Sequence, residues 1–251
     1  MRILLGLLLV VFAVPAEAVE VHYEAYAAGL NVVAMDADFD VTADRYRVKL
    51  DYRTVGGLSV LFSSRQSTTV EGRFVGDRAV PQRFYSAGTL RGAPRVTQID
   101  YRDGQPVVRQ LVPATETERE PVAPAQQADT IDSLSAMAEL IHTIQRTGRC
   151  DGRATTFDGR RLSMLDARTA GPQALESSWR SSFAGMTLRC DFVGRQLAGF
   201  MLNEDRATLQ RPQMGTAWFA PLVPGGAVVP VRIAFRTRWF GDATMYVAAP
   251  P

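Results

Sequence analysis

The sequence predicts a mainly β protein, an antiparallel meander that forms a curved sheet or open barrel with one central amphipathic helix packed on it. More than a dozen segments have the apolar alternation of β-strands. Turn signals such as Asp-Gly and Gly-Pro separate them by short connections, which favour antiparallel neighbours. Residues 130–147 alone repeat apolar side chains at steps of three and four, and such a helix needs a sheet to cover its apolar face.

The first 18 residues are typical of a secretory signal peptide. Arg2 is followed by an apolar stretch at 3–14, and 16–18 read Ala-Glu-Ala, the small-x-small cleavage pattern. The apolar stretch is too short to span a bilayer, which takes about 20 residues. We therefore expect cleavage after Ala18, a mature chain beginning at Val19, and a periplasmic location. An uncleaved membrane anchor is the alternative.

The remaining residues, 19–251, are interpreted as one β-rich domain, with a division into two subdomains at 113–128 as the alternative. Lys49 is the single lysine among the 28 basic residues, and the formal net charge is +2. The arginines are scattered along the strands and form no basic block, so we expect no nucleic-acid partner. A transmembrane barrel is a further alternative, which the helix at 130–147 disfavours.

A first strand is expected at 21–27, followed by a charged hairpin. Residues 33–41 and 45–53 alternate strictly, with aspartates on the outer face of the first strand and basic residues on that of the second. Aspartates at i, i+2 and i+4 of a strand lie in a row and do not converge on one calcium ion, so we interpret them as cross-strand ion pairs. The predicted pairs are Asp40–Arg45, Asp38–Arg47 and Asp36–Lys49.

The rest of the meander follows in order on both sides of the helix. A Pro-containing loop at 113–128 leads to the helix. The strands expected before it are 66–75, 80–89, 95–101 and 105–112, and those expected after it are 153–157, 161–169, 174–183, 186–193, 196–202, 208–209, 213–220, 229–239 and 244–248.

The helix at 130–147 has recognisable ends. Asp129 or Thr130 is a plausible N-cap, because its side-chain oxygen can accept a free first-turn N–H. Gly148 follows the last turn, the usual C-terminal signal. Its apolar stripe is formed by Ile131, Leu134, Met137, Leu140, Ile141 and Ile144.

Cys150 and Cys190 are the two cysteines of the chain. In an oxidising compartment an even pair at this separation is typical of a disulfide, since redox catalysis uses a Cys-x-x-Cys spacing. The disulfide would join the end of the helix to a later strand.

In the order of its motifs the chain resembles the bacterial exported family known as domain of unknown function 3108. The motifs are VHYEAYAAGLNV at 21–32, GRF at 72–74, IDSLSAM at 131–137, TFDGRR at 156–161 and VPVRIAF at 229–235. The resemblance implies an exported, mainly β protein and supplies no catalytic residues.

The sequence carries no familiar catalytic motif. Of the two histidines, His22 lies near the expected N-terminus, and His142 is interpreted as exposed or at the boundary of the core. Asp158 belongs to an Asp-Gly pair that is typical of a hairpin turn. The sequence therefore favours a non-enzymatic protein without deciding the question, and we expect no cofactor and no metal. A hydrolase would instead need Asp151, Asp158 and Asp166 to gather in one cleft.

A binding function fits the pattern better, since a strongly curved meander can hold an apolar cavity. The predicted function is a non-catalytic periplasmic binding module or carrier for a lipid or other apolar ligand. The alternative is a structural or protein-interaction module of the cell envelope. The candidate lining residues, which could equally fill the core, are Met35, Phe39, Tyr46, Leu50, Phe84, Met137, Ile141, Trp179 and Trp218.

Overall fold

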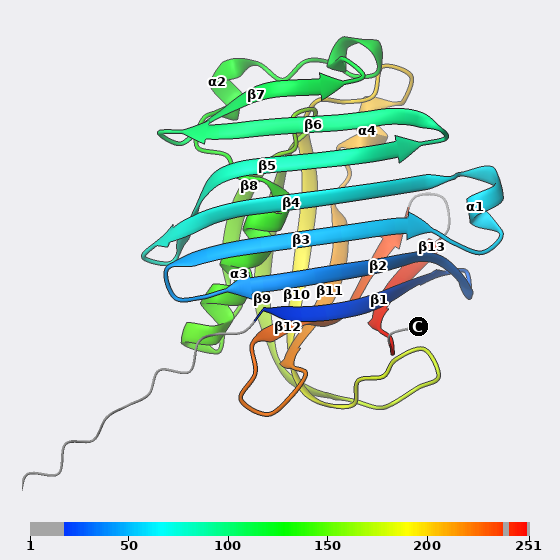
Figure 1. The fold of residues 1–251 in the computed structure, drawn as a ribbon, viewed down its shortest axis with the longest axis vertical. Coiled ribbons are helices and arrows are strands. Elements are labelled where there is room, and N and C mark those ends of the chain that lie inside the picture. Colours follow the sequence, from blue (N-terminus) through cyan, green and yellow to red (C-terminus); the bar gives the residue numbers. More distant parts are fainter. Residues whose placement is uncertain (1–17, 238–240, 250–251) are drawn as a thin grey trace, which may run out of the picture.

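Thirteen strands form one antiparallel sheet in the computed structural model, which describes residues 18–237 and 241–249 (Figure 1). Strands β1 to β7 follow one another in the sheet, as do β8 to β13, and the two series join where β1 (Val19–Ala27) pairs with β13 (Gly241–Val247). The sheet begins at β7 (Gln105–Val112) and ends at β8 (Gly152–Phe157), and these two edges do not pair with each other. The predicted mainly β meander is confirmed, and it is an open sheet.

Most of the remaining strands lie where they were predicted. They are β2 (Leu30–Val41), β3 (Arg45–Thr54), β4 (Ser64–Val75), β5 (Arg78–Leu90), β6 (Ala93–Arg102), β9 (Leu162–Leu175), β10 (Gly185–Ala198), β11 (Gln213–Pro221) and β12 (Val228–Thr237). The predicted separation of strands 186–193 and 196–202 is wrong, because β10 continues through Gly194, which pairs with Leu165 on one side and Gln213 on the other. The predicted strand at 208–209 is also wrong, because these residues belong to the helix α4 (Arg206–Leu209).

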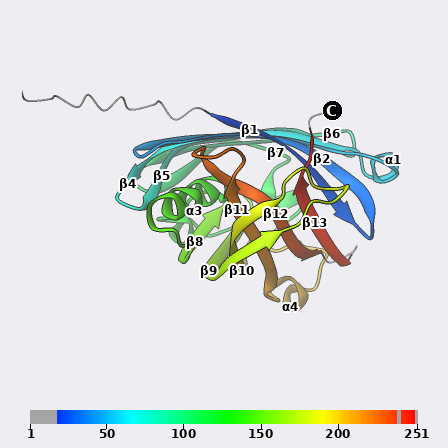
Figure 2. The same ribbon diagram turned by 90° about the horizontal axis from the view of Figure 1, so that it is seen from below.

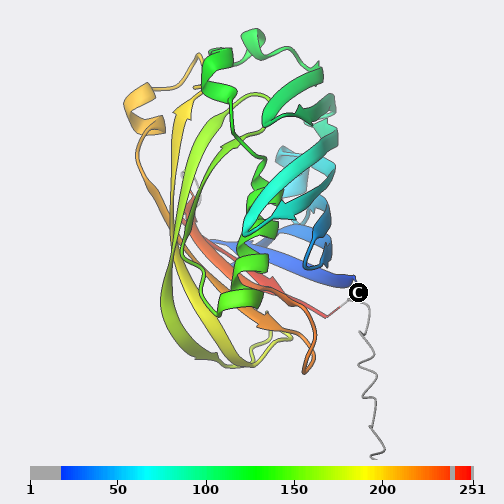
Figure 3. The ribbon, with the colours of Figure 1, turned by 90° about the vertical axis from the view of Figure 1, so that its left-hand side faces the viewer.

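The sheet curls so that β1–β7 and β8–β13 face each other across α3 (Ser133–Thr147), as Figures 2 and 3 show. Burial of apolar side chains between these layers is the main source of stability in such an arrangement. Val48, Val70, Ile99, Ile141 and Val231 are fully buried there. The short helices α1 (Leu58–Leu61), α2 (Pro124–Gln127) and α4 (Arg206–Leu209), with the 3-10 turn Thr115–Thr117, lie in connections.

The central helix begins three residues later than its apolar period predicts. Asp132, not Asp129 or Thr130, is the N-cap, and its carboxylate accepts the Ser135 backbone N–H at 2.8 Å. Ile131 is extended and bridges Thr156 of β8, so it cannot belong to the helix. Gly148, at a φ of 67°, ends the helix as predicted.

The charged hairpin keeps its predicted faces in a register shifted along the strands. The observed turn pairs Val41 with Tyr46, and because side chains alternate with a period of two, the aspartates still meet basic residues. Asp36 instead faces Asp51, and its carboxylate accepts a hydrogen bond from Nδ1 of the His22 ring at 2.6 Å. In this register Asp40 lies opposite Arg47 and Asp38 opposite Lys49. The ion pairs do not follow the register: Asp40 pairs with Arg45 at 3.8 Å, as predicted, whereas Lys49 pairs with Asp51 at 2.8 Å.

The predicted signal segment lies almost wholly outside the described residues. Among the helices of the described part of the chain, none is long and apolar enough to cross a membrane.

Candidate functional site

The two long faces of α3 have different surroundings. One face, which carries Ser135, Ala138, Ile141 and His142, is buried. The other face, which carries Met137 and its neighbours, is only half-buried. The helix therefore covers part of the concave sheet and leaves a second side open to a ligand or to solvent.

His142 lies on the buried face, and its predicted exposed or boundary position is wrong. Its ring is 2% exposed and stacks on Phe74, with ring centroids 3.9 Å apart and planes 9° apart. The residue belongs to the same helical face as Ser135 and Ala138, because steps of three and four residues return to one side of a helix.

A buried chain of hydrogen bonds anchors the start of α3 to β3. The Tyr46 hydroxyl donates to Ser135 Oγ at 2.8 Å, and Ser135 Oγ donates to Asp132 Oδ2 at 2.6 Å. Burial raises the pKa of the Asp132 carboxyl above its ordinary value, although the Ser135 hydroxyl and N–H act in the opposite direction. Farther along, Glu139 accepts the Ala79 backbone N–H at 2.6 Å. These contacts fix which face of the helix turns away from β3.

The half-buried face of α3 forms one wall of a pocket of about 160 Å³, called here the helix groove. The opposite wall is the concave face of β8–β12. The lining is mainly apolar, with Ala136, Met137 and Leu140 on the helix and Leu165, Phe192 and Ile233 on the strands. Gly215 of β11 pairs with Phe192 of β10. The glycine leaves room for the phenylalanine ring, since a β-carbon at position 215 would overlap that ring.

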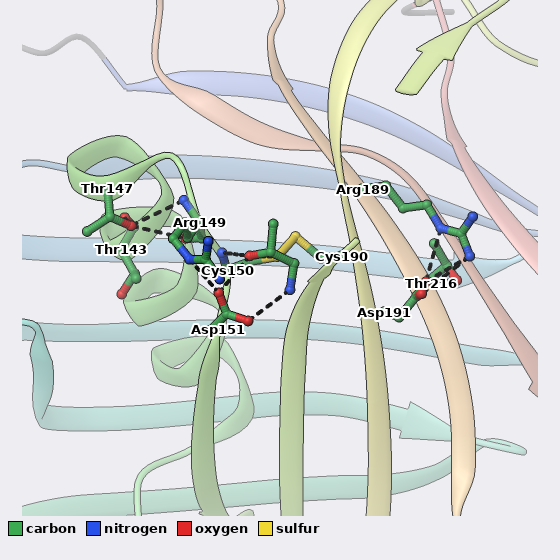
Figure 4. Close-up of a disulfide and its surroundings, with 10 residues drawn as sticks. Thr143, Thr147, Arg149, Cys150, Asp151, Arg189, Cys190, Asp191 and Thr216 are labelled. Atoms are coloured by element: carbon green, nitrogen blue, oxygen red, sulfur yellow. Dashed lines mark hydrogen bonds and ion pairs between the residues drawn. A yellow bond between two sulfur atoms is a disulfide. The ribbon is translucent and has the colours of Figure 1, made fainter. Parts of the chain in front are cut away.

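The predicted disulfide between Cys150 and Cys190 is confirmed (Figure 4). Cys190 belongs to β10 and lines the helix groove, so the bond ties the chain just beyond α3 to the opposite wall. Thr169 supports this junction, because its hydroxyl accepts the Cys150 N–H at 2.9 Å and donates to Asp151 at 2.9 Å. Hydrogen bonds from Thr169 and the charge of Arg149 hold the pKa of Asp151 below its usual value.

The nine candidate lining residues do not gather in one place. Met137 lines the helix groove, whereas Leu50 and Phe84 line a second pocket on the other side of the helix start. Trp179 lies apart from the rest in the connection between β9 and β10 and is 79% exposed. Phe39, Tyr46 and Ile141 are buried in the core, and Met35 and Trp218 are half-buried against it.

Sequence reasoning missed most of the groove residues on the strands. Leu165, Phe192 and Ile233 each have a charged neighbour on one side and an apolar neighbour on the other, so local alternation marks their strand face only weakly. Which strand face lies against α3 depends on the order and register of the strands in the sheet. The alternation of side chains within one strand does not predict that order or register.

The three carboxylates that a hydrolase would need are not brought together. Asp151 precedes β8 and Asp158 follows it, so the whole strand separates them. Each accepts charge-assisted hydrogen bonds from its own arginine, in the pairs Arg149–Asp151, Arg161–Asp158 and Arg153–Asp166. Within the described residues, no group of three or more His, Cys, Asp or Glu side chains is placed to hold a metal ion.

Comparisons with known proteins agree with this fold. The family model described as "Protein of unknown function (DUF3108)" matches residues 20–248. The fold is similar to the crystal structure of a beta-barrel-like protein of domain of unknown function DUF1849 from Brucella abortus, with a TM-score of 0.52 and 12% sequence identity. The likeness covers 94% of this chain and 97% of that chain, and at this identity it shows the fold alone. No curated protein matches the sequence.

Proposed function

The chain belongs to the DUF3108 family of proteins of unknown function, and from that premise we propose that it is a non-catalytic binding module or carrier for an apolar ligand such as a lipid acyl chain. The observation that carries the proposal is the helix groove. Its apolar side chains belong to the helix and to five strands, and they converge without filling the space between them. Apolar surface left in such a concave site favours an apolar occupant over water.

The size of the helix groove suits part of a chain-like ligand. Its volume of about 160 Å³ is close to that of an engineered apolar cavity of about 150 Å³ that accepts benzene. The groove is also partly open to solvent, so a longer chain can enter it with one end and extend beyond it. A single acyl chain has the required width and apolar character.

The groove is held between firmly connected walls. On one side α3 is fixed to β3 through the Tyr46–Ser135–Asp132 hydrogen bonds. On the other, the Cys150–Cys190 bond joins the segment after the helix to β10. A preformed site of this kind loses less conformational entropy on binding than one that must first order itself.

Filling the groove tests the proposal. Ala167 lines it on β9, and Ala167→Phe should lower the affinity for a monoacylglycerol, measured by calorimetry below the critical micelle concentration, by about tenfold or more. Ala170→Phe, at an exposed position of the same strand, is the matched control and should bind as the wild type does. Thermal melts establish that both variants fold.

Native mass spectrometry of the protein purified without detergent provides an independent measurement. We expect a bound lipid on the wild type and on Ala170→Phe, and little on Ala167→Phe. Wild-type protein that carries no lipid and does not bind the monoacylglycerol would refute the proposal.

We further propose that the protein is exported and acts in the periplasm. The disulfide supports this location, since such bonds persist in oxidising compartments and are rare in the cytosol. The intact mass of the protein recovered from the cell envelope should correspond to a chain that begins at Val19. Recovery of the full-length chain in the cytosol with free thiols would contradict it.

Interaction with another envelope protein is a second candidate function, and the surroundings of Trp179 favour it. This exposed side chain packs on two neighbours, with its ring edge-on to Tyr26 at 5.7 Å and the Arg180 guanidinium 4.4 Å from its centroid. Leu30, 69% exposed, is another apolar side chain beside Gly29, whose carbonyl accepts from Arg180 at 3.4 Å. Exposed tryptophan and arginine are typical centres of protein interfaces.

Crosslinking in the envelope distinguishes this second function. One dominant partner should be captured by the wild type and lost in Trp179→Ala. Met214→Ala, which removes an equally exposed side chain on β11, is the control and should retain the partner. Identical capture by both variants would argue against an interface at Trp179.

A further inference from the structure

A second and more polar pocket lies at the start of α3. It measures about 490 Å³ and is called here the arginine pocket. Its floor is the concave face of β3–β6, and its rim includes the loop before α2 and the turn after β8. Arg95, Arg119, Arg160 and Arg161 line it together with two carboxylates, so its formal charge is +2.

Two of the four arginines have carboxylate partners. Arg95 Nη2 donates to both oxygens of Glu118, at 2.5 and 2.6 Å. Arg161 donates to Asp158 through Nε at 2.8 Å and is also paired with it through Nη2 at 2.7 Å. These pairs use both acidic side chains of the pocket.

The other two arginines donate to backbone carbonyls instead. Arg119 Nη1 donates to the Gly199 oxygen at 2.9 Å. Arg160 donates to the Pro113 and Val112 oxygens at 2.7 and 2.8 Å. Within residues 18–237 and 241–249, neither guanidinium forms an ion pair. Carbonyls satisfy the N–H donors but do not neutralise the positive charge.

Burial makes this excess charge unfavourable. Arg160 is 7% exposed and Arg119 is half-buried. Burial, reinforced by the neighbouring Arg161, lowers the pKa of Arg119, and burial together with Arg95 lowers that of Arg160. An anion placed among these groups would remove the repulsion, and guanidinium groups bind phosphate and carboxylate with matched geometry.

The arginine pocket and the helix groove meet at Ser133, the first residue of α3, which lines both. A cationic site therefore adjoins an apolar one. We propose that the arginine pocket binds the oxyanion head group, phosphate or carboxylate, of an amphiphile whose acyl chain lies in the helix groove. This inference rests on the proposed function and names the class of ligand that the site would prefer.

A matched pair of ligands tests it on the wild-type protein. A monoacylglycerol and the lysophosphatidic acid with the same acyl chain differ only in the phosphate. Calorimetry below the critical micelle concentration should show about tenfold or more tighter binding of the phosphate-bearing lipid, because a charge-assisted contact is formed with this lipid alone. Inorganic phosphate without an acyl chain should bind much more weakly than this lipid.

Variants then locate the preference. Arg119→Gln should reduce the preference for the phosphate-bearing lipid to a few-fold or less, because the phosphate loses a guanidinium that has no carboxylate partner. Arg195→Gln, which removes an exposed arginine of β10 that lines neither pocket, should leave both affinities unchanged. Circular dichroism establishes that both variants are folded.

The possible failures are distinct. Equal affinity for the two lipids, or a preference that Arg119→Gln retains, overturns the head-group site and leaves the proposed apolar binding in place. Inorganic phosphate binding as tightly as the lysophosphatidic acid shows a site for free anions and also overturns the inference. If neither lipid binds, the proposed function itself fails and the inference fails with it.

Discussion

Ser135 holds the central helix in place through two hydrogen bonds that are both removed by a single substitution. Its hydroxyl donates to the Asp132 carboxylate and accepts from the Tyr46 hydroxyl. Ser135 and Asp132 are fully buried and Tyr46 is 2% exposed, so water does not replace a lost partner. Ser135→Ala therefore leaves the tyrosine hydroxyl without an acceptor and the carboxylate with one donor fewer.

The expected cost follows from these two groups. A hydrogen bond to a charged group contributes about 1.5–3 kcal/mol, and a stranded buried donor costs about 1–3 kcal/mol. Because the two effects share one hydroxyl, we expect Ser135→Ala to lower the free energy of unfolding by about 3 kcal/mol. Tyr46→Phe removes only a neutral donor and leaves the Ser135–Asp132 bond intact, so it should cost about 1 kcal/mol.

Urea unfolding with the disulfide intact, followed by circular dichroism, measures both values. The double variant is the sharpest control. Once Ser135 is alanine, Tyr46→Phe removes a hydroxyl that already lacks its partner, so the second substitution should cost nothing or restore stability. Equal losses for the two single variants, or additive losses in the double variant, would refute this hydrogen-bonded chain as the anchor of the helix.

Three further predictions concern packing, charge and the covalent bond. Gly72→Ala should lower the free energy of unfolding by about 1–3 kcal/mol, because a β-carbon at position 72 would overlap the side chain of Tyr46. Gly152→Ala meets no atom within 4 Å and should hardly change the melting temperature; equal melting of the two variants would contradict the steric argument. Burial acts to raise the pKa of Asp158, but its paired arginine and two backbone N–H groups outweigh burial and hold it below its ordinary value of 3.8. The resulting stability is present above that pH and is lost as the pH falls through the folded-state pKa, so Asp158→Asn should destabilise the protein more at neutral pH than at a pH below 3.8 in urea titrations. A loss of equal size at both pH values would show that charge is not the cause. Replacing Cys150 and Cys190 by alanine should cost about 4 kcal/mol for a separation of 40 residues, and unchanged urea midpoints would exclude this contribution.

Local sequence patterns predicted much of the fold. The alternation of Phe39 and Val41 with the aspartates predicted the buried face of the second strand, because side chains of a strand alternate whatever it pairs with. Gly148 ended the helix as predicted, since a left-handed residue favours glycine. The two cysteines sufficed to predict their bond, because there was one way to pair them.

Longer-range features needed the tertiary structure. The start of the helix at Asp132 depends on the bridge between Ile131 and β8, a strand that comes later in the chain. His142 is buried because Phe74 of β4 provides a ring to stack on, which no helical period specifies.

The sequence by itself determined most of the strands, the presence of the central helix, the disulfide and the family, because these follow from local sterics, from periodicity and from the order of motifs. The tertiary structure alone decided which face of the helix is left half-covered and which arginines share a pocket. Arg95 and Arg160 are distant in the chain, and they meet because the curled sheet brings β6 near the turn after β8. That encounter depends on sheet order and curvature, which arise from packing among all the strands and leave no signature in any single segment.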